Sequence, residues 1–105
     1  MSVERRSNAG WAVHPGDILL KEFLQPMGIS GYALAKGIKV NAQTISDITR
    51  RKRGISADIA IRLAKFFKTT EEFWMNLQTS YELAMARQRN KAAVSKIQPH
   101  GVHAA

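Results

Sequence analysis

The sequence predicts a small all-α bundle of five helices. Apolar residues recur at intervals of three and four, and no stretch alternates between apolar and polar residues as a half-buried strand does. Polar residues able to cap a helix precede most of these apolar runs. A chain of 105 residues with 45% hydrophobic content can bury one core. We therefore expect a single domain over residues 14–86, with a flexible arm at 1–13 and, at 87–105, a fraying helix that becomes a basic tail.

The first helix is expected to begin within the sequence HPGD at 14–17, because proline suits the first helical position and an acidic residue suits the first turn. The helix should end in the segment 25–28, since Pro26 disfavours helical geometry at Gln25. The buried face of this helix is expected to hold Ile18, Leu19 and Phe23, with Leu20 as a further candidate.

Two short helices joined by a tight turn are expected over residues 31–50. Small Ala35 would let the second of them cross the first closely, and Ile45 would fill the gap between them. Asn41 stands where the second helix should begin, with a side-chain oxygen that can cap its free amides. Lys39 lies in the turn, which requires either a left-handed conformation at that residue or a different turn. The packing positions of the pair are Leu34, Ala35, Val40, Ile45 and Ile48.

The last two helices are expected to follow the capping residues Ser56 and Thr70. The final helix carries more apolar surface than one face needs. Its main stripe is Phe73, Leu77, Tyr81 and Ala84, and the apolar residues partly off that stripe are Trp74, Met75 and Met85. Burial in the domain's own core and contact with a second subunit explain this surplus equally well. The candidate residues for a homodimer interface are Trp74, Leu77 and Tyr81.

The charge of the chain indicates an anionic partner. Sixteen Lys and Arg against eight Asp and Glu give a formal net charge of +8, which suits nucleic acid, an acidic protein or a membrane surface. Four consecutive basic residues at 50–53 directly follow the second helix of the pair. Such a run is ordinarily a solvated charge run, but here it would lie beside the phosphates that flank a DNA groove. No broad apolar face opposes the basic residues, so we expect no membrane partner.

Several other classes of function are disfavoured by the residues present. The polar residues assemble no nucleophile with a base, no pair of carboxylates on one helix face and no phosphate-cradling glycine loop, so we expect no enzyme and no cofactor. The absence of cysteine removes disulfides and thiolate metal sites, and no metal site is expected. No apolar run approaches the length of a membrane span, which predicts a cytoplasmic protein.

Four features of the helix pair occur together: Leu34-Ala35, Val40-Asn41, Ile45-Ser46 and Ile48. In this combination the pair resembles the helix-turn-helix DNA-binding domains of the lambda-repressor-like class. The chain departs from that class at two positions. Lys39 occupies a turn position where the class usually has glycine, and Gly31 occupies a position where it often has glutamine.

The second helix of the pair would enter the major groove and face it with its first turns. Gln43 is the best candidate for reading a base, since its amide can pair with adenine, and Thr44 suits a thymine methyl group or a phosphate. Asp47 would either accept a hydrogen bond from cytosine or restrain a neighbouring arginine. Asn41 divides between capping and a phosphate contact, with capping its main role. The expected contacts to the DNA backbone come from Lys39, Asn41, Ser46, Arg50, Arg51, Lys52 and Arg53.

Three further motifs narrow the resemblance: HPGD at 14–17, AIRLA at 60–64 and FWMNLQ at 73–78. Over residues 13–86 the chain resembles the HigA-type antitoxins, also called plasmid-maintenance or virulence-associated antidote proteins. The resemblance implies a homodimer that binds double-stranded operator DNA, represses its own operon and neutralises a RelE-like mRNA-cleaving toxin. The toxin partner follows from the resemblance alone, and the arm, the tail and the fifth helix are all candidate surfaces for it. The alternative is a stand-alone transcriptional regulator of the same fold, without a toxin partner.

Overall fold

The computed structural model describes residues 12–101, so nearly all of the expected arm at 1–13 lies outside the described residues. The helical elements are α2 (Pro15–Ile18), η1 (Leu19–Leu24), α3 (Gln25–Met27), α4 (Gly31–Ile38), α5 (Ala42–Thr49), α6 (Ala57–Phe67), α7 (Glu71–Arg89) and α8 (Lys91–Ser95). The first three are continuous and make up the expected first helix. All five expected helices are present in this part of the chain, and α8 adds a short one.

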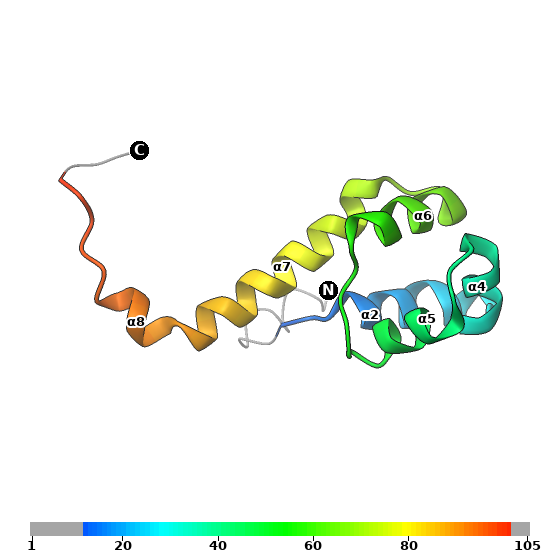
Figure 1. The fold of residues 1–105 in the computed structure, drawn as a ribbon, viewed down its shortest axis with the longest axis horizontal. Helices are drawn as coiled ribbons and strands as arrows, with labels where there is room; N and C mark the ends of the chain where they lie inside the picture. The colour runs from blue at the N-terminus through cyan, green and yellow to red at the C-terminus, as the bar shows by residue number, and fades with distance from the viewer. Residues whose placement is uncertain (1–11, 102–105) are drawn as a thin grey trace.

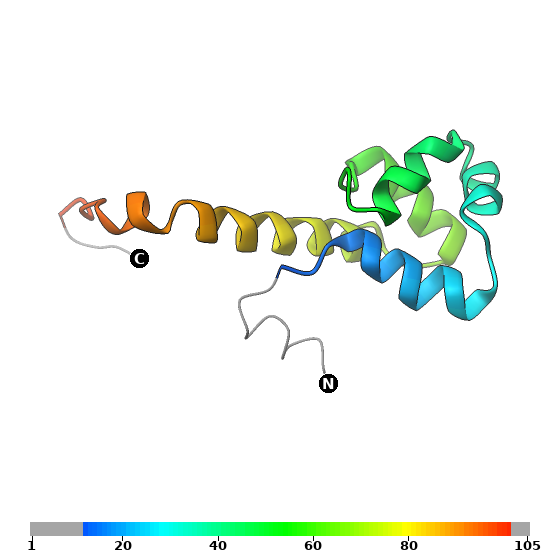
Figure 2. The ribbon, with the colours of Figure 1, turned by 90° about the horizontal axis from the view of Figure 1, so that it is seen from below.

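The first six elements form a bundle at one end of the molecule, and the long helix α7 leaves that bundle towards the C-terminus (Figure 1). Seen after a quarter turn, α7 and α8 still extend away from the bundle (Figure 2). Helix α7 continues to Arg89, past the expected domain boundary at residue 86. No helix of the described residues is long and apolar enough to cross a membrane.

The core of the bundle is built from the apolar faces of η1, α4, α5, α6 and α7, together with Ile55 from the loop before α6. Four of the five packing positions expected for the helix pair are buried, and Val40 is half-buried. Ala35 is 2% exposed and Ile45 is 1% exposed, which places the small residue and the residue that fills the gap where they were expected. The other fully buried large side chains are Pro15, Leu19, Leu63 and Trp74.

The expectation that Trp74 belongs to a dimer interface is wrong. Its side chain is 0% exposed and lies against the rings of Phe23 and Phe67 inside the bundle. The indole N–H donates to the Thr69 hydroxyl at 2.8 Å, which satisfies its one polar group. Helix α7 is therefore rotated so that Trp74 faces inward, and Phe73 from the expected stripe is 37% exposed.

The first helix ends inside the expected segment 25–28, but the expected effect of Pro26 on Gln25 is wrong. Gln25 has φ −65° and ψ −49°, and the helix ends only at Gly28, where φ is +65°. Proline normally disrupts a helix because its ring meets the carbonyl four residues earlier. Here the preceding turns are π-helical, with the Gln25 N–H bonded to the Leu20 carbonyl, and this wider ladder accommodates the ring.

Hydrogen-bonded caps define where each later helix starts. The side-chain oxygens of Ser30, Asn41, Ser56 and Thr70 each accept a backbone N–H from the residue three positions on. At the other end, α4 and α6 stop at Lys39 and Lys68, both in the left-handed conformation. The turn between α4 and α5 thus contains a left-handed Lys39, which decides between the two alternatives for that residue.

Candidate nucleic-acid interface

The start of helix α5 is fixed by Asn41. Its side-chain oxygen accepts the Thr44 N–H at 2.9 Å and the Thr44 hydroxyl at 3.1 Å. The amide oxygen of Asn41 is thereby occupied by capping, in line with the main role expected for it. The hydroxyl proton of Thr44 is used in this bond, so towards DNA Thr44 offers its hydroxyl oxygen as an acceptor and its methyl group.

The two residues expected to read bases with Thr44 are joined to each other. The Gln43 side-chain Nε2 donates to Asp47 Oδ1 at 2.7 Å, one helical turn further along α5. A carboxylate only accepts hydrogen bonds, so the amide must turn its nitrogen to Asp47 and its oxygen away. Asp47 therefore restrains Gln43, and within residues 12–101 it pairs with no arginine, which was one of its two expected roles. Gln43 is exposed, so its amide oxygen and its second N–H are free to meet a base.

The basic cluster at 50–53 begins where α5 ends. Arg51 is left-handed, with φ +64°, and the backbone N–H of Lys52 bonds back to the Asp47 carbonyl at 2.7 Å. The side chain of Arg51 is held by Asp17, with 3.0 Å between Nε and Oδ1. Asp17 raises the pKa of the Arg51 guanidinium through this hydrogen bond and its charge. The other three basic side chains are exposed.

The HPGD sequence holds the first helix against the last turn of α5. A Cβ atom at Gly16 would lie 2.8 Å from the carbonyl carbon of Ile48, and closer still to its oxygen, so only glycine allows this approach. His14 caps the helix by accepting the Gly16 N–H at Nδ1, at 2.9 Å. The His14 ring is buried and packs on Tyr81 with 4.7 Å between centroids.

The electrostatics at His14 follow from this packing. Burial is the main cause that lowers its pKa, the charge of Arg51 lowers it further, and the charge of Asp17 acts in the opposite direction. The imidazole is therefore held in its neutral form, which is the form whose Nδ1 can accept the capping hydrogen bond.

Gln78 is a structural residue whose role the sequence did not reveal. Its side chain is 8% exposed and accepts the Ile55 N–H at 2.7 Å, while its Nε2 donates to Glu82 at 2.8 Å. The bond from Ile55 attaches the loop after the basic cluster to α7. The signal was present as the glutamine that closes the FWMNLQ motif, a polar residue that lies one helical turn after Trp74 and so shares its inward face.

Comparison with known proteins decides the family. Residues 20–74 match the family described as helix-turn-helix. Antitoxin HigA-1 of Vibrio cholerae is 36% identical over 87 residues, which cover 83% of this chain and 82% of that protein. The chain belongs to the HigA-type antitoxin family. Virulence-associated protein I of Dichelobacter nodosus is 44% identical over 99 residues, covering 94% of this chain and 91% of the relative.

A solved structure shows the same fold in a HigA-type antitoxin. The structure described as Pseudomonas aeruginosa antitoxin HigA with higBA promoter superposes with a TM-score of 0.82 at 50% identity, covering 85% of this chain and 98% of that one. The family consists of helix-turn-helix DNA-binding antitoxins and regulators, which are not enzymes. The fold and family expected from the sequence are thus confirmed.

The motifs HPGD and FWMNLQ, which identify this HigA-type chain, have structural roles in the bundle. HPGD places α2 on the end of α5, and FWMNLQ supplies the buried Trp74 and Gln78. The expected base-reading residues lie together on α5, the helix that these motifs hold in place. Most of the expected backbone contacts flank it, from Lys39 in the turn before α5 to the cluster at 50–53 after it, and Ser46 lies on α5 itself.

Proposed function

We propose that this chain is the sequence-specific DNA-binding antitoxin of a type II toxin–antitoxin module, which represses its own operon in the cytoplasm and neutralises a RelE-like mRNA-cleaving toxin by direct binding. The observation that carries the proposal is helix α5, capped at Asn41, with Gln43 exposed and basic residues on both sides. The HigA relative that was solved with its promoter supports DNA as the partner.

In this proposal α5 is the recognition helix and Gln43 reads a base. With its nitrogen tied to Asp47, the amide presents its oxygen and its second N–H outward, which is the pair of groups that adenine N6 and N7 require. Asp47 orients the amide and also offers a free carboxylate oxygen to an adjacent cytosine N4. The methyl group of Thr44 suits a thymine methyl.

The backbone contacts come from the turn and from the cluster at 50–53. Lys39, Arg50, Lys52 and Arg53 are exposed on either side of α5 and supply most of the non-specific affinity. Asn41, Ser46 and Arg51 add contacts that position the helix, with Arg51 already oriented by Asp17.

A homodimer would place two α5 helices in successive major grooves, about 34 Å apart. The extending part of the chain supports this assembly, because Leu83 on α7 and Val94 on α8 are 46% and 56% exposed. Leu77 and Tyr81 are half-buried on α7 and stay candidates for the interface. Sedimentation of wild type and of Leu83→Glu tests it: the variant should shift to the monomer, and an unchanged dimer would place the interface elsewhere.

The test of the toxin partner is co-expression with the product of the adjacent small reading frame, scored by growth rescue and by co-purification. We expect the neighbour to arrest growth alone, and to be silenced and retained on a column in the presence of this chain. A neighbour that is harmless, or that never binds, would contradict the antitoxin proposal and leave the stand-alone regulator.

A further inference from the structure

The turn before the recognition helix contains a residue in a conformation that its side chain disfavours. Lys39 has φ +63° and ψ +49°. The backbone N–H of Lys39 bonds to the Lys36 carbonyl at 3.3 Å, and that of Val40 bonds to the Ala35 carbonyl at 3.0 Å. Relative to right-handed geometry, a non-glycine residue is disfavoured there by roughly 5- to 30-fold. The turn at Lys68 has the same left-handed conformation and the equivalent backbone bond, from the Thr69 N–H to the Ala64 carbonyl at 3.0 Å. The turn at Lys39 has a further contact, which comes from a side chain of α6.

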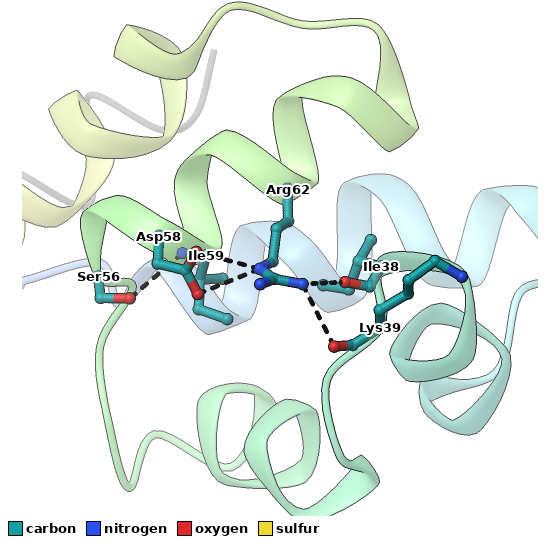
Figure 3. A network of polar contacts seen from close by, with 6 residues as sticks. All are labelled: Ile38, Lys39, Ser56, Asp58, Ile59 and Arg62. Atoms are coloured by element: carbon teal, nitrogen blue, oxygen red, sulfur yellow. Dashed lines mark hydrogen bonds and ion pairs between the residues drawn. The ribbon is translucent and has the colours of Figure 1, made fainter.

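Arg62 on helix α6 reaches this turn (Figure 3). Its Nη1 donates to the Ile38 carbonyl at 2.8 Å and to the Lys39 carbonyl at 3.2 Å. Its Nε lies 3.1 Å from both carboxylate oxygens of Asp58, one helical turn earlier on α6. The guanidinium therefore connects α6 to the C-terminal end of α4, and its bonds to Asp58 fix its orientation.

The physical reasons for this bridge are clear. Carbonyls in the last turn of a helix have no partner within the helix, and they form the negative end of its dipole. A guanidinium satisfies them with charge-assisted hydrogen bonds, and its planar fork also engages the carboxylate of Asp58. Asn41, which caps α5, follows Lys39 closely, so fixing the Lys39 carbonyl fixes where the recognition helix begins.

We propose that Arg62 is a positioning residue for DNA recognition: it holds the left-handed turn at Lys39 and thereby sets the placement of α5, without touching DNA itself. This inference rests on the proposed DNA-binding function. It gives a reason why the chain tolerates lysine where lambda-repressor-like domains usually have glycine.

A competing role for Arg62 is direct contact with a phosphate. The two roles differ in their salt dependence, because a lost phosphate contact lowers the slope of log affinity against log salt by about one, whereas lost positioning leaves that slope unchanged. The matched control is Lys65→Ala, which removes an exposed positive charge from the same helix. The turn is bonded by Arg62 and not by Lys65, so this control leaves those bonds in place.

The first experiment measures binding of the full chain to the DNA upstream of its own gene by fluorescence anisotropy, at several salt concentrations. We expect Arg62→Ala to weaken binding about 10-fold with an unchanged salt slope, and Lys65→Ala to weaken it less than about 3-fold. A fall in slope of about one for Arg62→Ala would overturn the positioning role.

The second experiment asks whether Arg62 acts through Lys39. Lys39→Ala and Lys39→Gly both remove the ammonium group, but only glycine favours the left-handed turn. In the wild-type background the two variants should bind alike within about 2-fold, because Arg62 holds the turn in both. In the Arg62→Ala background glycine should bind at least about 3-fold better than alanine. The same glycine-to-alanine ratio in both backgrounds would overturn the inference.

Two further measurements keep the test decisive. Should Arg62→Ala fail to fold, Arg62→Lys replaces it, since lysine keeps the charge but cannot bond the carbonyls and Asp58 together. Thermal midpoints of Lys39→Ala and Lys39→Gly, each with Arg62 and with Arg62→Ala, test without DNA whether Arg62 holds the turn. A difference in midpoint between the glycine and alanine variants that is larger in the Arg62→Ala background supports the inference. Wild type that binds operator and shuffled DNA equally would instead contradict the proposed function.

Discussion

Gly16→Ala is the substitution for which the structure makes the sharpest statement about stability. The added Cβ would lie 2.8 Å from the Ile48 carbonyl carbon and closer to its oxygen, whereas real Cβ contacts essentially never come under 3.0 Å. The atoms in the way are backbone, so α2 must move away from the last turn of α5. Overpacking of this kind costs about 1–3 kcal/mol, and the helix propensity of alanine returns up to ~1 kcal/mol.

We therefore expect Gly16→Ala to lower the free energy of unfolding by about 1–2 kcal/mol, measured by urea denaturation with circular dichroism. Movement of α2 also disturbs the pair between Asp17 and Arg51, so operator affinity should fall. The control is Gly31→Ala, whose Cβ would meet Ile45 at an ordinary 3.5 Å. It should stabilise the chain by about 0.5–1 kcal/mol. Equal midpoints for Gly16→Ala and wild type would refute this account of α2 and α5.

Three other outcomes are expected. Because the native state lowers the pKa of His14, the unfolded state binds more protons, and the free energy of unfolding should fall as the pH drops below about 6.5, by at most ~1.4 kcal/mol per pH unit. Urea midpoints at pH 7.5 and 5.5 measure this fall. The same fall in His14→Gln would contradict the assignment to His14. Gln78→Leu leaves the Ile55 N–H buried without a partner and should cost about 1–3 kcal/mol in urea unfolding, and no loss would contradict the role of this bond. Arg53→Gln should weaken binding to operator and shuffled DNA alike and lower the salt slope by about one, and a loss confined to the operator would argue against a phosphate contact.

The helix pair could be predicted from the sequence because its determinants are local. The caps act over three residues, and the small Ala35 opposite Ile45 encodes a close crossing within a short stretch of chain. The orientation of α7 could not be predicted, since its surplus of apolar residues offers more than one stripe. Periodicity identifies such a helix as amphipathic but does not choose the stripe that faces the core. Trp74 was misassigned for that reason.

Two other features depend on contacts that no local pattern encodes. Gln78 bonds to a residue 23 positions away, and Arg62 bonds to one 24 positions away. The motifs FWMNLQ and AIRLA contain these two residues, but neither motif indicates the distant backbone group to which its residue bonds. The π-helical turn that accommodates Pro26 has no sequence signature either, and a rule derived for regular α-helices failed there.

The most direct test of the account compares Gln43→Ala with wild type on two DNA fragments, the upstream region of the gene and a shuffled version of it, by fluorescence anisotropy at fixed salt. Wild type should prefer the upstream fragment by about a thousand-fold or more. Gln43→Ala should lose most of its affinity for the upstream fragment and little for the shuffled one, which shrinks that preference. Equal losses on both fragments would contradict the claim that α5 reads the operator through Gln43.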